Sequence, residues 1–261
     1  MRAPAIVILC LILAAAAAPL LAPYAPEQID LARRREPPSA THVFGTDDLG
    51  RDVFARVLYG ARVSLAVGLL SAAVAGALGV AIGGVAGYAG GAVDTTLMRG
   101  TDAMLAVPRL PLLMIAAALF QPSIPLLVVF IGGAGWMETA RVVRAEFIAL
   151  RSRGFVESAR AAGAGHARLI AVHLLPNAAQ TIIVSMTLAV ARGILLESAL
   201  SFFGVGVRPP QASWGNMLYQ AQATLSSEPW LAFAPGLFIL MTTLSVNLIG
   251  ERLSSRRSSN A

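Results

Sequence analysis

The chain has 261 residues, of which 56% are hydrophobic and 13% are charged. Soluble domains carry about 25% charged residues, so this composition excludes an ordinary soluble protein and indicates one embedded in a membrane. All twenty basic residues are arginine. A P-loop ATPase needs a lysine that reaches the nucleotide phosphates, so that class is also excluded, and any ATP hydrolysis must belong to another chain.

The formal net charge is +6. The arginines stand between apolar stretches, so membrane topology explains them better than nucleic acid does, and no nucleic-acid partner is expected. The single cysteine, Cys10, lies inside an apolar stretch. It offers neither a disulfide framework nor a thiolate metal site, and we interpret it as a small buried hydrophobic residue. We expect no cofactor and no metal ion.

Residues 1–22 form the first segment, in which an apolar run follows Arg2. A basic start, an apolar middle and a run of alanines also suit a cleaved secretory signal peptide. About 19 helical residues at 1.5 Å each nearly cover a hydrocarbon core of about 30 Å. Because further apolar spans follow, we interpret the segment as an uncleaved first transmembrane helix.

Residues 23–62 form a polar loop with six arginines and six acids. It contains the run His-Val-Phe-Gly-Thr-Asp-Asp-Leu-Gly-Arg-Asp at 42–52. The aspartates Asp47, Asp48 and Asp52 lack the alternate spacing and the distal glutamate of a calcium-binding loop. We expect capped turns beside a helix at the membrane surface, with contact to a substrate or a binding protein as the alternative.

The second span is predicted over 63–85, where alanine and glycine are abundant. Small residues let membrane helices approach closely, so this helix is expected to be buried in a bundle. Asp94, Arg99 and Asp102 follow. Charges inside a membrane are often functional, but here we favour an interfacial helix whose charges meet lipid headgroups and neighbouring groups.

The third and fourth spans are predicted over about 104–120 and 124–143. Pro108 in the third is tolerated where neighbouring helices satisfy the freed carbonyls. Glu138 and Arg141, three residues apart, are expected to form a modest surface pair.

An arginine-rich loop, 144–177, is the longest interruption between apolar spans in the second half. Its sequence predicts a short helix over 156–162, a glycine break, and a second helix that must end or kink at Pro176. The break is expected at Gly163 and Gly165, because glycine tolerates the positive φ of a sharp turn.

The fifth span is predicted over 178–196 and the sixth from residue 230 onward, with a short tail at 254–261. Arg192 and Glu197 flank the far end of the fifth span. We expect their side chains to snorkel toward the membrane surface, with a pair to another helix as the alternative.

The loop resembles the Glu-Ala-Ala loop of permeases of ABC importers, with Ser158 in place of the first alanine. The matching positions are Glu-Ser-Ala at 157–159, Gly163, and Leu-Pro at 175–176. Its ending, His-Leu-Leu-Pro-Asn, resembles the dipeptide, oligopeptide and nickel branch of that family. Further runs are similar to signatures of the same branch, in the expected order, at 42–52, 200–206 and 209–217.

The resemblance implies an all-α membrane protein with six transmembrane helices, the type I ABC importer permease fold, and a cytoplasmic coupling helix. A five-helix core would occupy 63–253. The implied partners are a paralogous permease in a heterodimer, two ATP-binding subunits and an extracytoplasmic substrate-binding protein. This chain would be no enzyme; it would translocate dipeptides or oligopeptides, with nickel chelates or glutathione-like peptides as alternatives. The residues expected to dock on the ATPase are Glu157, Ser158, Ala159, Arg160, Gly163 and Gly165.

Six spans place both termini on one side of the membrane. That side holds twelve arginines and the opposite loops hold seven. The positive-inside rule therefore places the termini and the loop 144–177 in the cytoplasm, and the resemblance implies the plasma membrane of a prokaryote.

An ion-coupled secondary transporter is the alternative from another class. It predicts paired acids at the midplane and inverted repeats, and neither is evident in the sequence. A membrane enzyme would need a clustered nucleophile and base, whereas His42, His166 and His173 fall on different sides in this topology.

Overall fold

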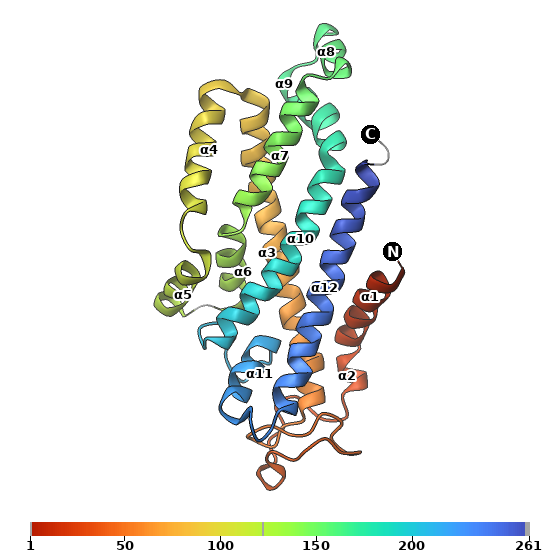
Figure 1. Cartoon of the computed structure of the whole chain (residues 1–261), viewed down its shortest axis with the longest axis vertical. Coiled ribbons are helices and arrows are strands. Elements are labelled where there is room, and N and C mark those ends of the chain that lie inside the picture. The colour runs from red at the N-terminus through yellow and green to blue at the C-terminus, as the bar shows by residue number, and fades with distance from the viewer. Residues whose placement is uncertain (1, 122, 259–261) are drawn as a thin grey trace.

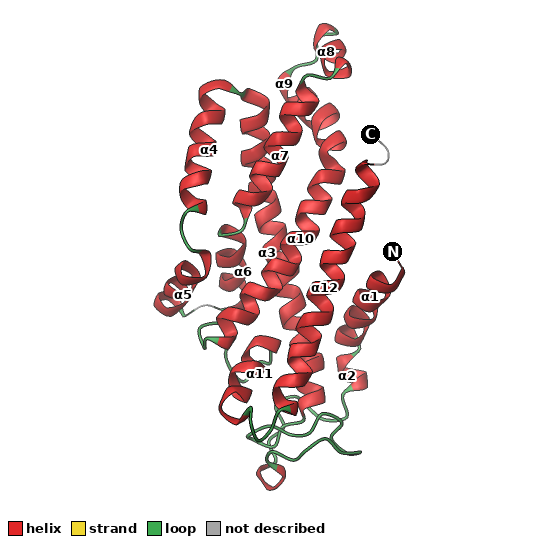
Figure 2. Ribbon diagram, in the orientation of Figure 1, coloured by secondary structure: helices red, strands yellow, loops and turns green. Residues whose placement is uncertain are grey.

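The computed structural model describes residues 2–121 and 123–258, which form helices and loops without a β-strand (Figure 1, Figure 2). The predicted all-α class is confirmed for these residues. The long helix α3 (Val53–Ala89) runs through the bundle. The helices packed along it include α1 (Arg2–Ala16), α7 (Trp136–Arg151), α10 (Leu175–Phe202) and α12 (Trp230–Ser258).

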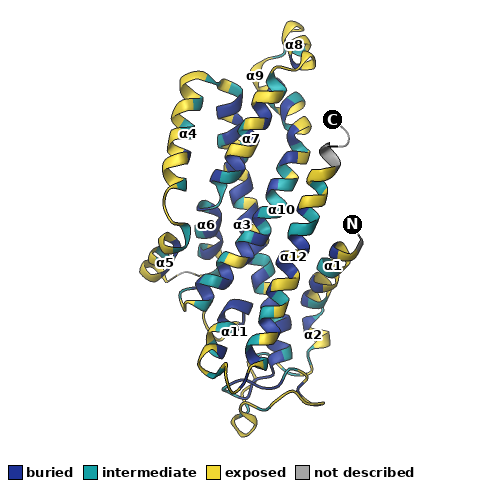
Figure 3. Cartoon of the chain, in the orientation of Figure 1, coloured by how far each residue is buried: buried dark blue, intermediate teal, exposed yellow. Residues whose placement is uncertain are grey.

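Shorter helices lie at the ends and on one side of this bundle. They are α2 (Ala18–Leu21), α4 (Gly91–Leu105), α5 (Arg109–Phe120), α6 (Ile124–Gly133), α8 (Gly154–Ala161), α9 (His166–Arg168) and α11 (Trp214–Ala221). The described residues also include two 3₁₀ turns, at Leu31–Arg33 and Gln222–Thr224, and a π-helical stretch, Leu169–Leu174. Buried residues concentrate on α3, α7 and α10, whereas α4 and α8 are largely exposed (Figure 3).

Helix α3 begins at Val53, ten residues before the predicted second span. Asp52 caps it, because the backbone N–H of Ala55 donates to Asp52 Oδ1 at 2.7 Å. With 37 residues, α3 is about 55 Å long, well beyond a hydrocarbon core of about 30 Å. Its first turns, residues 53–62, therefore occupy the last part of the predicted polar loop.

The predicted burial of the glycine-rich span is confirmed, and its reason is a close crossing with α7. Gly79, Gly83 and Gly87 recur every fourth residue and so lie on one face of α3. A Cβ added at Gly83 would lie 2.2 Å from the carbonyl oxygen of Ala140. Only glycine lets the two backbones approach this closely.

Neither the third nor the fourth predicted span is a single straight helix. Helices α4 and α5 meet at a 78° bend, and α6 and α7 meet at a 44° bend. Pro108 lies at the first break, where it disfavours helical geometry in the residue before it. At the second break α6 ends at Gly133 and α7 is preceded by Gly135, and glycine is a weak helix former.

Of the two outcomes predicted at Pro176, an end of the helix was wrong, and a kink stays a prediction. His166–Phe202 is one continuous helical segment of 37 residues. The turns just before the proline, Leu169–Leu174, are π-helical. The wider π-helical turn accommodates a residue that lacks an N–H and whose ring would clash with a carbonyl of the preceding α-helical turn.

Within residues 2–121 and 123–258, three helices are long and apolar enough to cross a membrane, and up to five segments qualify when each bent pair counts as one. The described part of the first segment contains a shorter apolar helix, Ala3–Ala16. Helix α12 continues to Ser258, into the predicted tail, and residues 259–261 lie outside the described part of the chain. The chain is thus a multi-pass helical membrane protein.

Candidate functional site

Helix α8 lies at one end of the bundle, opposite the loop that joins α2 to α3 (Figure 1). Val156 is fully buried in a cluster at this end, together with Phe147 of α7 and Leu169 of the following helix. Ala159, three residues after Val156 and so on the same face, packs partly against that cluster. Helix α8 is therefore attached to the bundle through one narrow apolar face.

Most of the predicted docking residues of α8 are exposed. Glu157, Ser158 and Arg160 are exposed, and Ala159 is half-buried beneath them. Glu157 lies in the first turn of the helix, where the helix dipole favours a negative charge. The structure therefore brings these four residues together on one short helix that projects from the end of the bundle.

The turn after α8 confirms the predicted glycine break. Gly163 has φ +84°, which other residues adopt only under strain. Its N–H donates to the carbonyl of Arg160, and the N–H of Ala164 donates to that of Ala159, both at 3.0 Å. This is a Schellman motif, which satisfies the last carbonyls of the helix.

The space around these glycines is open within the chain. A Cβ at Gly163 or Gly165 would meet no atom within 4 Å. Gly165 has φ −71°, so its backbone does not require glycine. The positive φ, and not crowding by the chain itself, explains Gly163.

The site is joined to the end of α3. Arg151, the last residue of α7, donates from Nη1 to the carbonyl oxygen of Tyr88 at 3.0 Å. The ring of Tyr88 also packs edge-on against that of His166, the first residue of α9, with centroids 5.7 Å apart. A displacement of α8 and α9 would therefore reach α3 as well as α7 and α10.

Two ion pairs fix α4 to α7. Asp94 pairs with Arg144 through both carboxylate oxygens, and Asp102 pairs with Arg141 at 2.5 Å. The prediction that charges of this segment meet neighbouring groups is confirmed for Asp94 and Asp102, whose neighbours are arginines of α7, whereas the interfacial position of the helix stays a prediction.

The predicted pair of Glu138 with Arg141 was wrong. Glu138 instead pairs with Arg109 of α5, at 3.0 Å, and with Arg192 of α10. The alternative for Arg192, a pair to another helix, is confirmed. Sequence spacing could not reveal this cluster, because its three members come from three different helices.

The prediction that Glu197 snorkels was wrong, because its side chain is fully buried. Its carboxylate accepts hydrogen bonds from Ser64 of α3 and Ser201 of α10, both at 2.8 Å, and from Ser198 at 3.4 Å. A buried polar group needs such partners, because an unpaired one is costly. The serines around it in sequence were the available signal, but the α3 partner was not evident.

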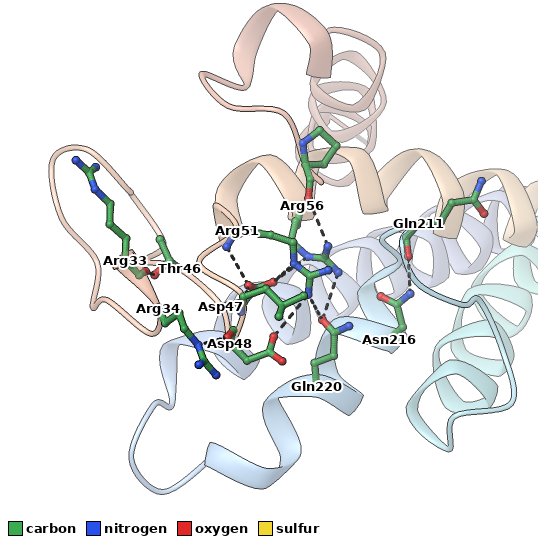
Figure 4. A network of polar contacts seen from close by, with 12 residues as sticks. Arg33, Arg34, Thr46, Asp47, Asp48, Arg51, Arg56, Gln211, Asn216 and Gln220 are labelled. Atoms are coloured by element: carbon green, nitrogen blue, oxygen red, sulfur yellow. Dashed lines mark hydrogen bonds and ion pairs between the residues drawn. The ribbon is translucent and has the colours of Figure 1, made fainter. Parts of the chain in front are cut away.

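At the opposite end of the molecule, the run at 42–52 forms a buried polar network (Figure 4). Asp47 Oδ2 lies 2.7 Å from Nε of Arg51 and 3.4 Å from Nε of Arg56. Both arginines also donate to Oε1 of Gln220 in α11, at 3.3 Å each. The predicted capped turns are confirmed, but the adjoining helix is the start of α3 and not a surface helix.

A second group of hydrogen bonds at this end fixes the start of α11. Ser213 caps the helix and exchanges hydrogen bonds with Asn216 in a capping box. Asn216 Nδ2 also donates to the carbonyl of Gln211 at 2.8 Å (Figure 4). The polar side chains at this end therefore join α3 and α11 to the loop that precedes α3.

The chain is thus a multi-pass helical bundle that holds a short, largely exposed helix at one end. Residues 79–259 match the family described as the inner membrane component of binding-protein-dependent transport systems, and residues 5–38 match the N-terminal transmembrane domain of oligopeptide transport permease C. The chain belongs to this family of inner-membrane permeases.

Individual relatives cover almost the whole chain. A putative peptide permease protein of Brucella suis is 40% identical over 237 residues, which are 90% of this chain and 78% of the relative. A putative peptide transport system permease protein of the same organism is 38% identical over 95% of this chain and 83% of its own length. The dipeptide transport system permease protein DppC of Bacillus subtilis is 39% identical over 95% and 78%.

Proposed function

We propose that this chain is the membrane-spanning permease subunit of an ATP-driven importer of dipeptides or oligopeptides. Membership of the binding-protein-dependent family implies partners that bind ATP and partners that bind substrate. The printed names of the relatives, which refer to peptides and dipeptides, support the substrate class. Nickel chelates and glutathione-like peptides are the alternatives that the branch leaves open.

The proposed topology has six crossings, made by 1–22, α3, the pair α4–α5, the pair α6–α7, α10 and α12. Residues 23–62 face the extracytoplasmic side, with the core at 63–253, and the loop 144–177, the tail 254–261 and both termini face the cytoplasm. The arginine count supports this orientation. So does the position of α8 at the end opposite the loops 22–52 and 203–229 (Figure 1).

The proposal depends mainly on how α8 is attached to the bundle. One buried residue, Val156, holds the helix, while Glu157, Ser158 and Arg160 point outward from it. This arrangement suits a coupling helix that inserts its polar face into a groove on a partner ATPase. The turn at Gly163 and Gly165 offers a backbone that the partner can approach closely.

Motion would pass from the ATPases through α8 to the bundle. Because α8 follows α7 after a two-residue break and precedes the helical segment that leads into α10, closure of the ATPases around ATP would move both helices. A paralogous permease in a heterodimer would supply the other wall of the cavity. Rotation of the two subunits would then expose that cavity to the binding protein and afterwards to the cytoplasm.

Uptake into proteoliposomes tests the proposal, with the assembled importer and its binding protein. Gly163→Asp is expected to abolish peptide uptake while ATP hydrolysis persists, because an added side chain separates α8 from the ATPase. Gly91→Asp is the matched control: Gly91 is also exposed, has φ +57°, and has no atom within 4 Å of an added Cβ. Normal uptake with Gly163→Asp, or an equal loss with Gly91→Asp, would contradict the docking role.

A further inference from the structure

The two helix breaks lie beside each other and enclose a recess. A groove of about 320 Å³ is lined by residues on both sides of both breaks, among them Met104, Leu112 and Met137. Non-helical backbone at membrane depth is tolerated only where protein buries it or where it lines a water-filled cavity. In transporters, broken helices of this kind commonly form substrate sites.

Three charged side chains meet at the edge of this recess. Nη2 of Arg109, the first residue of α5, lies 3.0 Å from Oε1 of Glu138, and Arg192 pairs with Oε2 of the same carboxylate. The side chains of Glu138 and Arg192 remain 36% and 38% exposed, and that of Arg109 remains 21% exposed. Charges facing lipid at this depth would be costly, so we expect this cluster to face water or solute.

The cluster has unused binding capacity for an anion. Two guanidinium groups share one carboxylate, which leaves one net positive charge. Each guanidinium carries five N–H donors in a planar fork that matches a carboxylate. Among the described residues, neither Arg109 nor Arg192 has a further hydrogen-bond or ion-pair partner for its side chain.

A second groove, of about 240 Å³, continues from Arg192 and Glu138 along α10 toward the α8 end, where Ser254 of α12 lines it. The charged cluster thus lies between an apolar recess and a groove that runs to the proposed cytoplasmic side. Such a location suits a binding site on the path of a transported solute.

We propose that Arg109 and Arg192 bind the terminal carboxylate of a peptide in transit, while the apolar recess, which Met104 and Met137 help to line, accepts the side chain of its last residue. This inference rests on the proposed function. Methionine is flexible and polarisable, so such a recess accommodates side chains of different shapes. Glu138 competes for the same donors, which keeps binding weak enough for the peptide to leave.

Photolabelling of the assembled importer without its binding protein tests this site. The probe is a dipeptide with a diazirine on its last residue, prepared as the free acid and as the C-terminal amide. The acid is expected to label the peptides containing Met104 and Met137 at least about tenfold more than the amide, since a hydrogen bond to a charged group contributes about 1.5–3 kcal/mol. Arg192→Gln and, independently, Arg109→Gln should reduce acid labelling to the amide level.

The matched control is Arg99→Gln, because Arg99 is an exposed arginine of α4 outside the recess and should leave the preference unchanged. Equal labelling by acid and amide in the unaltered protein would overturn the proposal. So would a preference that survives in both variants, a result expected if the arginines instead contact the partner permease. Uptake of the same dipeptide is measured separately, so a failed importer with intact labelling would refute only the proposed function.

Discussion

The close crossing of α3 and α7 predicts that Gly83→Ala destabilises the protein, by an amount that follows from one distance. In Gly83→Ala the new methyl carbon would lie 2.2 Å from the carbonyl oxygen of Ala140, and backbone cannot rotate away as a side chain can. Ordinary contact needs about 3.5 Å, so the helices must separate by about 1 Å. Overpacking of this kind costs about 1–3 kcal/mol.

Two other glycines calibrate the effect. In Gly76→Ala the atoms nearest the methyl group would belong to the flexible side chain of Met186, at 3.0 Å, and in Gly100→Ala it would meet no atom within 4 Å. Alanine also favours a helix over glycine by about 1 kcal/mol, so these two variants should be neutral or slightly stabilised. From most to least stable, the expected order is therefore Gly100→Ala, then Gly76→Ala, then Gly83→Ala.

Thermal unfolding of the purified subunit in detergent measures this order. Relative to Gly100→Ala, which gains the same helix propensity, a loss of about 1–3 kcal/mol should lower the midpoint for Gly83→Ala by about 2–12 °C for a chain of this size. Loss of monodispersity on size-exclusion chromatography after heating gives an independent readout. Gly83→Ala as stable as Gly100→Ala would show that α3 and α7 are not packed as described.

Two further changes probe the ends of the bundle. Val156→Ala removes a fully buried anchor of α8 and should cost about 2 kcal/mol locally, so hydrogen exchange in 154–161 should rise while α3 stays protected; unchanged exchange would contradict the anchoring. Asp47→Ala leaves Arg51 and Arg56 buried without their carboxylate and should cost about 3–5 kcal/mol in thermal unfolding. Asp48→Ala, whose side chain is 47% exposed, should cost less than about 1 kcal/mol, and equal losses would argue against the buried network.

Features governed by local sequence were predictable. The abundance of small residues in 63–85 correctly indicated a helix buried against its neighbours, because close approach requires small side chains wherever the partner comes from. Gly163 correctly marked the end of a helix, because its positive φ is a property of the turn itself. The projection of α8 as a separate short helix followed from the same pattern.

Features that depend on contacts between distant helices were not predictable. Glu138 has an arginine three residues away, yet its partners lie on α5 and α10. Glu197 looked like the end of a span, but Ser64 of α3 helps to bury it. Pro176 does not end its helix, because the π-helical turns before it accommodate the proline ring.

Cross-linking from α8 tests most directly whether a separate ATPase moves this permease from the cytoplasmic side. Cys10 is the native cysteine, so in a Cys10→Ser background the exposed Ser158→Cys places one thiol on α8, and Ser39→Cys places one in the loop at the opposite end. With the importer assembled in native membranes, Ser158→Cys is expected to cross-link to the ATP-binding subunit and Ser39→Cys is not. Labelling of Ser158→Cys by a membrane-impermeant maleimide added outside intact cells, with no cross-link to the ATPase, would contradict the account.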